Sequence, residues 1–145
     1  MRVILQVVNH SEVIIEGKLH NKIEKGYLLL VGIGKEDSEE NVKSMALKIS
    51  KLRVFHDENG KTNLDIKSVN GEILSISQFT LYANTNGGNR PDFLNAASKE
   101  KAIYLYNLFN EELSNYGLIV KDGVFGADMK VDLENDGPFT IFLEN

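Results

Sequence analysis

One stretch of the sequence restricts the fold more than any other, the unbroken apolar run Tyr27-Leu28-Leu29-Leu30-Val31-Gly32-Ile33-Gly34. A strand covered on one face alternates apolar and polar residues, whereas a strand covered on both faces is apolar throughout. The run therefore predicts a central strand with other layers on both sides. A chain of 145 residues suffices for one such domain, over residues 1–145, and is too short for a second core.

Two helices are predicted from apolar residues that recur at three- and four-residue steps. The first begins at 37–40, where Ser38 and two early acids suit the amino end of a helix, and its apolar face is formed by Val42, Met45, Ala46, Ile49 and Leu52. The second is capped by Ser98 and stopped by Gly117, and its apolar face is formed by Ala102, Leu105, Phe109, Leu113 and Tyr116.

The remaining β-rich runs predict strands. We expect an amino-terminal hairpin whose turn is Asn9-His10-Ser11. The strand GEILSIS, residues 71–77, is expected to run directly on to Ala83, and a polar, glycine-rich surface loop to follow it at 84–95. Three strands should close the chain, at 118–125, 129–134 and 139–143. The predicted fold is a mixed α/β single domain, in the order of two strands, two strand-helix units and three strands.

Composition excludes several function classes. The chain has no cysteine, which removes disulfides, thiolate zinc sites and thiol nucleophiles. The amino-terminal apolar run is too short to span a membrane and lacks a cleavage site, so we expect a cytoplasmic protein with no membrane partner. A net charge of −5 argues against binding along many phosphates, so any nucleic-acid contact should be small.

Common catalytic and metal motifs are also missing. Ser77 is not in a Gly-x-Ser-x-Gly turn, and the histidines at 10, 20 and 56 fall in apparent turns with no metal-binding spacing. The stretch from Asp57 to Asn63 resembles a calcium loop only weakly, and a plain hairpin turn fits it better. Gly32-x-Gly34 lacks a third glycine at dinucleotide-binding spacing. We therefore expect no metal ion and no cofactor.

Two polar stretches are candidates for a site. Ser77-Gln78-Phe79-Thr80 places three polar side chains at what should be a buried strand end, where they need partners or a ligand. Hydrogen bonds to neighbouring strands would satisfy them equally well. Asn135-Asp136-Gly137-Pro138 joins two predicted strands, and its X-Pro bond could present a backbone carbonyl in a fixed direction. A simple turn is an alternative explanation for this segment.

Together with other blocks, these stretches resemble the D-aminoacyl-tRNA deacylase family. The similar segments are SISQFTLYA at 75–83, GNRPDF at 88–93, FGADM at 125–129 and NDGPFT at 135–140, in the family's order and spacing. MRVILQ and KGYLLLVGIG extend the resemblance to essentially the whole chain. The resemblance implies a three-layer β/β/α domain in a homodimer whose active sites lie at the subunit interface.

The resemblance also implies an activity, hydrolysis of the ester between a D-amino acid and the 3′ end of its tRNA. In one subunit Ser77, Gln78, Phe79 and Thr80 would line the catalytic pocket. Gly137 and Pro138, joined by a cis bond in the family, would enter from the partner subunit and exclude L-amino acids. Phe125, Gly126, Ala127 and Met129 would shape the pocket around adenine and the aminoacyl group, although Phe125 and Met129 could equally be core residues.

The mechanism implied by the family is assisted by a hydroxyl of the terminal ribose, since no candidate base lies near Thr80 in sequence. Backbone amides of Phe79 and Thr80 would stabilise the oxyanion, with Thr80 positioning the ester without becoming a covalent nucleophile. Steric exclusion of a Cβ cannot reject glycine, so glycyl-tRNA is a predicted second substrate. The expected protein is a tRNA editing hydrolase.

The chain departs from the family's pattern at several positions. Val7 stands where most relatives carry an arginine that is expected to brace the Gly-Pro segment, Asn86 and Gly87 replace a lysine pair, and Phe139 replaces a valine. Valine cannot supply the donors of an arginine, so another residue locks the segment or its geometry is looser. Two alternatives follow: a family member acting on an L-aminoacyl-tRNA, and a dimeric binding protein without catalysis.

Overall fold

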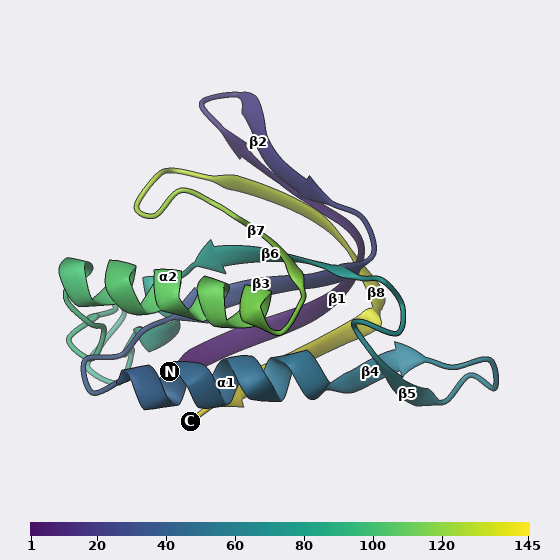
Figure 1. Cartoon of the computed structure of the whole chain (residues 1–145). Coiled ribbons are helices and arrows are strands. Elements are labelled where there is room, and N and C mark those ends of the chain that lie inside the picture. The colour runs from purple at the N-terminus through teal and green to yellow at the C-terminus, as the bar shows by residue number, and fades with distance from the viewer.

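A computed structural model describes all 145 residues. The chain forms, in order, β1 (Arg2–Ile15), β2 (Lys18–Ile23), β3 (Gly26–Gly32), α1 (Glu39–Lys51), β4 (Arg53–His56), β5 (Thr62–Asp65), β6 (Glu72–Ser77), the 3-10 helix η1 (Phe79–Tyr82), α2 (Lys99–Asn115), β7 (Ile119–Asp122) and β8 (Lys130–Glu144). Figure 1 shows both helices on one side of a strongly curved sheet.

The sheet is organised around the long strand β1. Its order is β2-β1-β3-β6-β7, with β8 paired to the other edge of β1, and β4 and β5 form a separate hairpin. The first part of β1, residues 2–8, pairs with β3, and its last part, residues 11–15, pairs with β2. Because β1 pairs with β3 at its start and with β2 at its end, the sheet curls over itself. The strand β2, the carboxyl end of β1 and the amino end of β8 arch over β6 (Figure 1).

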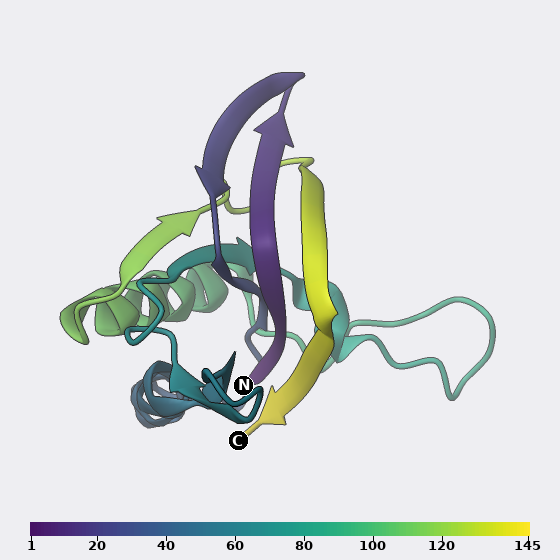
Figure 2. The same cartoon turned by 90° about the vertical axis from the view of Figure 1, so that its right-hand side faces the viewer.

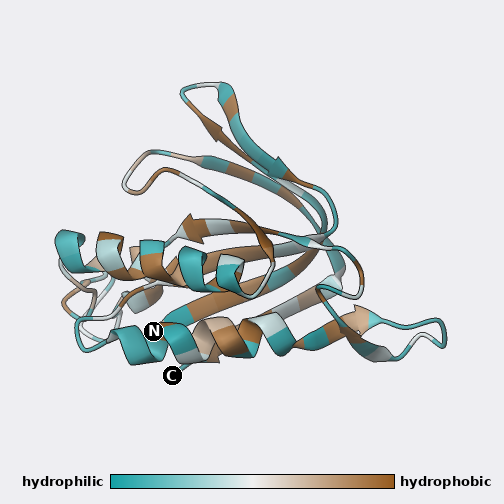
Figure 3. Ribbon diagram, in the orientation of Figure 1, coloured by the Kyte–Doolittle hydropathy of each residue, from teal (hydrophilic) through white to brown (hydrophobic).

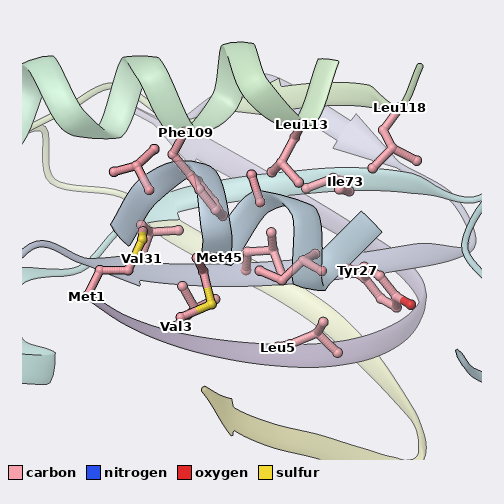
Figure 4. Close-up of a cluster of buried hydrophobic side chains, with 14 of the residues drawn as sticks. Met1, Val3, Leu5, Tyr27, Val31, Met45, Ile73, Phe109, Leu113 and Leu118 are labelled. Carbon is pink, nitrogen blue, oxygen red and sulfur yellow. The ribbon is translucent and has the colours of Figure 1, made fainter. Parts of the chain in front are cut away.

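Two apolar clusters fill the two sides of β3. Tyr27, Leu29 and Val31 belong to the larger cluster, which both helices complete (Figure 4). Leu28, from the opposite face of the same strand, belongs to a smaller cluster beneath the curled part of the sheet, together with Val8, Val13, Ile23, Leu74 and Ile76. The prediction of a central strand covered on both faces is therefore confirmed. The three layers consist of helices and two β layers that are parts of one sheet.

The close pairing of β3 and β6 requires glycine at position 26. These strands are parallel, and Gly26 lies opposite Glu72 in their register. A Cβ built at Gly26 would lie 1.8 Å from the backbone oxygen of Glu72, far inside contact distance. Any side chain at this position would separate the two strands that lead into the candidate site.

Both helices follow their predicted pattern. Val42, Met45, Ala46 and Ile49 are buried on α1, and Leu105, Phe109 and Leu113 are buried on α2. Figure 3 shows polar residues along the outer sides of the helices and apolar residues toward the sheet. The Ser98 hydroxyl accepts a hydrogen bond from the Lys101 amide at 3.4 Å, and the chain turns away at Gly117 with φ +78°.

The predicted amino-terminal hairpin is wrong in its position. Asn9, His10 and Ser11 lie inside the continuous strand β1, and the turn falls at Glu16-Gly17, both with positive φ. Polar residues are tolerated in this strand because β8 supplies hydrogen-bond acceptors for their side chains. The Ser11 hydroxyl is buried and donates to the Asp132 carbonyl oxygen at 2.8 Å. The side-chain nitrogen of Asn9 donates to the Glu134 carboxylate at 2.7 Å.

The later strands also differ from the prediction. The strand at 72–77 ends at Ser77 and continues as η1, not as an extended strand to Ala83. Two strands, β7 and β8, close the chain instead of three, because the runs 129–134 and 139–143 are parts of one long strand with an irregularity between them. The hairpin β4-β5 was not assigned as strands, so the predicted element order is wrong in detail.

The segment 84–95 is the surface loop expected from its sequence, and it projects from the body of the molecule between η1 and α2 (Figure 2). Its base is tied by a bridge between Asn84 and Asp92. Neither helix has the length and apolar character needed to cross a membrane.

Candidate active site

A cavity with a volume of about 320 Å³ lies where the carboxyl end of β6 meets α2 and the segment between β7 and β8. Eleven of its fifteen lining residues are hydrophobic. The lining consists of Val31, Ile33, Ile76, Ser77, Gln78, Phe79, Ala97, Ala102, Tyr106, Phe125, Gly126, Ala127, Asp128, Met129 and Val131. A mostly apolar hollow with a few polar groups is typical of a small-ligand site.

This cavity brings together two of the predicted blocks from distant parts of the sequence. Ser77, Gln78 and Phe79 form one part of its lining, and Phe125, Gly126, Ala127 and Met129 form another. Thr80 does not line the cavity, but its hydroxyl accepts a hydrogen bond from the Gln78 side-chain amide. That these residues form the active site stays a prediction.

The wall at Ser77 to Thr80 is shaped by the end of β6. The Gln78 amide donates to the Val31 carbonyl oxygen at 2.7 Å, and the chain then turns into η1. The turn leaves Phe79 more than half exposed, at 56%, with its ring edge-to-face against Phe93 at a centroid separation of 4.9 Å. Thr80 is exposed beside it, so the polar stretch lies at a rim and not in a buried strand as expected.

The lining residues between β7 and β8 belong to a tight turn anchored on β6. The Gly123 amide donates to the Ser75 carbonyl oxygen at 3.0 Å, and the Ala127 amide donates to Val124 at 3.1 Å. Gly126 has φ +76°, a conformation that residues with a Cβ rarely adopt. Phe125 and Met129 line the cavity and also contact the apolar clusters, so the pocket and core interpretations of these residues are compatible.

Tyr106 of α2 is a lining residue that the sequence reasoning missed. Its hydroxyl donates to the Ser75 carbonyl oxygen at 2.8 Å, and its ring lies 6.1 Å from that of Phe125. Burial raises the pKa of this phenol above its ordinary value of 10.0, so the side chain stays protonated at neutral pH. The position could have been found from the sequence, since Tyr106 follows Leu105 and lies four residues after Ala102 on the apolar face.

The cavity offers few groups for acid-base or nucleophilic catalysis. Its titratable side chains are Tyr106, held protonated, and Asp128 at the rim. None of the histidines lines it. Their predicted placement in turns is wrong for two of them, since His10 lies within β1 and His20 within β2, while His56 ends β4.

The segment considered for calcium binding, 57–63, uses its first carboxylate in other contacts. The Asp57 carboxylate accepts hydrogen bonds from the Asn59 and Lys61 amides and from the Asn63 side chain, which shapes the β4-β5 turn. The hydrogen bond from the Lys61 amide is the largest cause of a lowered pKa at Asp57. No three histidine, cysteine, aspartate or glutamate side chains gather as metal ligands would.

The Gly137-Pro138 segment lies away from the cavity of its own chain. Both residues are exposed, the peptide bond between them is cis, and Gly137 has φ +123°. Gly137 contributes instead to a hollow of about 80 Å³ whose lining also includes Val7, Lys25 and Phe139. A single chain therefore does not combine its Gly-Pro segment with its cavity.

Comparisons with known proteins point to one family. The family model described as D-Tyr-tRNA(Tyr) deacylase matches residues 4–144. A protein of Lactobacillus delbrueckii subsp. bulgaricus named D-aminoacyl-tRNA deacylase is 57% identical over 144 residues, which covers 99% of both chains. A protein of the same name from Staphylococcus epidermidis is 51% identical, covering 100% of this chain and 96% of the relative.

Two solved structures are also similar. The structure described as c-Myc DNA Unwinding Element Binding Protein has a TM-score of 0.93 and 41% identity, covering 100% of this chain and 99% of the other. A probable eukaryotic D-amino acid tRNA deacylase has a TM-score of 0.85 and 16% identity, covering 98% and 97%, and shows the fold alone. With the family model matching nearly the whole chain, the protein belongs to the D-Tyr-tRNA(Tyr) deacylase family of hydrolases.

Proposed function

We propose that this chain is a tRNA editing enzyme that hydrolyses the ester of D-aminoacyl-tRNA. One observation carries the proposal most directly. The fold gathers Ser77 to Phe79 and Phe125 to Met129, separated by almost fifty residues of sequence, around a single cavity. Relatives that share more than half of the sequence carry the name of this activity. The cavity is large enough for an aminoacyl group and its attachment to the terminal ribose.

The chiral selection in this proposal comes from a second subunit. Gly137 and Pro138 of the partner subunit reach the cavity in a homodimer and place a backbone wedge where the Cβ of an L-amino acid would go. The exposure of the segment on the surface of its own chain supports this arrangement, since it leaves both residues free to contact a partner. Backbone cannot rotate away as a side chain can, so exclusion by contact is effective.

The same argument predicts a second substrate. Glycine has no Cβ, and a wedge that acts only on the Cβ has nothing to exclude. We therefore expect glycyl-tRNA to be hydrolysed as well as D-aminoacyl-tRNA, with L-aminoacyl-tRNA resistant to the enzyme.

The reaction is assisted by the substrate. A hydroxyl of the terminal ribose helps a water molecule attack the ester carbonyl carbon. The bond to the ribose oxygen then breaks, and that oxygen takes up a proton to leave free amino acid and tRNA. Apart from the exposed carboxylate of Asp128 at the rim, the cavity side chains include no base, which supports this route. The amides of Phe79 and Thr80 begin η1, where first-turn N–H groups have no helical partner, so they can donate to the oxyanion.

The proposed partner is the 3′ end of an aminoacyl-tRNA, bound in the cytoplasm. A net charge of −5 fits a protein that holds the end of a tRNA with few phosphate contacts. It does not favour the binding of a DNA duplex, the class of function named for one similar structure. Two other readings remain for the test: a member that acts on an L-aminoacyl-tRNA, and a dimeric binding protein without activity.

Hydrolysis of D-tyrosyl-, L-tyrosyl- and glycyl-tRNA by the purified protein, without added metal, tests the proposal. We expect rapid release from the D and glycyl esters and a rate for the L ester near the uncatalysed background. Preferential hydrolysis of the L ester would replace the proposal with altered specificity, and no hydrolysis of any ester would leave a binding protein.

Two further measurements address the mechanism. A D-tyrosyl-tRNA whose terminal ribose lacks the free neighbouring hydroxyl should be hydrolysed at least about 10²-fold more slowly, the range expected for one group acting in the transition state. Full activity on that substrate would contradict substrate assistance. Sedimentation at the assay concentration should give twice the chain mass of 16.2 kDa, and an active monomer would contradict the role of the partner subunit.

A further inference from the structure

The Gly-Pro segment is an unusually large irregularity in β8. Gln6 pairs with Thr140 and Val8 pairs with Asn135, so one residue of β1, Val7, lies opposite the four residues 136–139. Three extra residues must therefore leave the ladder. The backbone groups in such a bulge lose their partners in the neighbouring strand and need others to hold a fixed shape.

Asn135 supplies those partners at the base of the bulge. Its side-chain oxygen accepts a hydrogen bond from the Phe139 amide at 2.8 Å, which joins the residue before the bulge to the last residue of the bulge. Its side-chain nitrogen donates to the Thr140 hydroxyl at 2.9 Å. The side-chain nitrogen of Gln6 also donates to that hydroxyl, at 3.3 Å. One asparagine thus closes the loop and links it to β1.

The residue directly opposite the bulge contributes only packing. Val7 is 4% exposed, and it lines the small hollow together with Gly137 and Phe139. Its side chain carries no hydrogen-bond donor. Phe139 is half-buried and packs against the main core cluster, which holds the carboxyl end of the bulge. Hydrogen bonding within the segment is therefore concentrated on Asn135.

We propose that Asn135 is a positioning residue that fixes the orientation of Gly137 and Pro138 and thereby sets the preference for D over L esters. The inference rests on the proposed function, in which this segment enters the cavity of the partner subunit. Asn135 does not touch the substrate. It acts through the bulge, and it supplies the bracing that valine at position 7 cannot supply.

Three variants test this role. Asn135→Ala removes both hydrogen bonds, whereas Asn135→Asp keeps the acceptor for the Phe139 amide. Asn9→Ala is the matched control, because Asn9 is an exposed asparagine on the neighbouring strand whose side chain also bonds to β8, at Glu134. For each protein kcat/KM is measured on D-tyrosyl- and L-tyrosyl-tRNA, and hydrogen exchange is measured at the Phe139 amide.

We expect Asn135→Ala to lower the D-over-L ratio about tenfold and to speed exchange at Phe139 by about the same factor, as for the loss of a hydrogen bond. Asn135→Asp and Asn9→Ala should keep the ratio within about 1.5-fold of the starting protein. If Asn135→Ala does not fold, Thr140→Val, which removes the outer hydroxyl, should lower the ratio by about threefold.

Several outcomes would overturn the role of Asn135. The first is an unchanged D-over-L ratio in Asn135→Ala or, if that variant does not fold, in Thr140→Val. The second is unchanged hydrogen exchange at the Phe139 amide in Asn135→Ala. The third is a loss of selectivity in Asn135→Asp as large as in Asn135→Ala. Failure of the starting protein to hydrolyse the D ester would refute the proposed function separately. Exchange at Phe139 would then still decide whether Asn135 holds the bulge.

Discussion

Replacing Tyr106 by phenylalanine tests the structural role assigned to this wall of the cavity. The hydroxyl donates to the Ser75 carbonyl oxygen, which also accepts the Gly123 amide. The carbonyl therefore keeps one partner in the variant, and the loss is that of a single net hydrogen bond, about 1 kcal/mol. The ring and its contact with Phe125 remain. We expect the free energy of unfolding to fall by that amount.

The expected change in melting temperature follows from the chain length. Unfolding entropy near the midpoint is roughly 2.1 cal/mol/K per residue, so 145 residues give about 0.3 kcal/mol/K and a fall of about 3 °C in Tm. Calorimetry measures the shift, and deacylation of D-tyrosyl-tRNA measures kcat. Tyr104→Phe is the control on the same helix, since its hydroxyl bonds to Glu39 at the exposed surface. It should change Tm by less than about 1 °C.

Two results would refute this reasoning. A Tm equal to that of the starting protein would mean that the hydrogen bond to Ser75 adds nothing to stability. A fall in kcat of about 10² or more would assign the Tyr106 phenol to proton transfer and not to a purely structural role.

The remaining predictions concern stability. Gly26→Ala should lower the free energy of unfolding by about 3 kcal/mol or more, because its Cβ overlaps the Glu72 backbone oxygen, and urea titration measures the loss. Hydrogen bonds from the Ser68 amide and hydroxyl hold the pKa of Asp65 below its ordinary value of 3.8. Its ionised form therefore stabilises the fold above that pH, and the stability is lost as pH falls through the lower pKa. Asp65→Asn should be less stable at pH 7 and nearly equal at pH 2.

Prediction from the sequence succeeded where a local pattern determines the structure. The apolar run at 27–34 was placed correctly because residues on both faces of one strand must be buried, and β3 is covered on both sides. The helices were found from their three- and four-residue spacing, and Ser98 caps α2 as expected. The family resemblance named the blocks that line the cavity, and the family itself is confirmed.

The errors share one physical cause. Asn9 to Ser11 read as a turn because their side chains are polar, yet they remain in β1 since β8, more than a hundred residues later, supplies their partners. The runs on either side of Gly137 and Pro138 read as separate strands, yet one neighbouring strand pairs with both. Such long-range pairing cannot be inferred from the local sequence.

Burial on one or both faces leaves a pattern along the chain, so the sequence alone predicts the central strand and the two helices, and the family resemblance identifies the blocks. How those blocks meet depends on the tertiary structure. It placed Ser77 to Phe79 and Phe125 to Met129 around one cavity and left Gly137 and Pro138 outside it. It also showed that Asn135 bonds across the bulge opposite Val7. Contacts of this kind depend on strand register and chain curvature, which no short segment of sequence specifies.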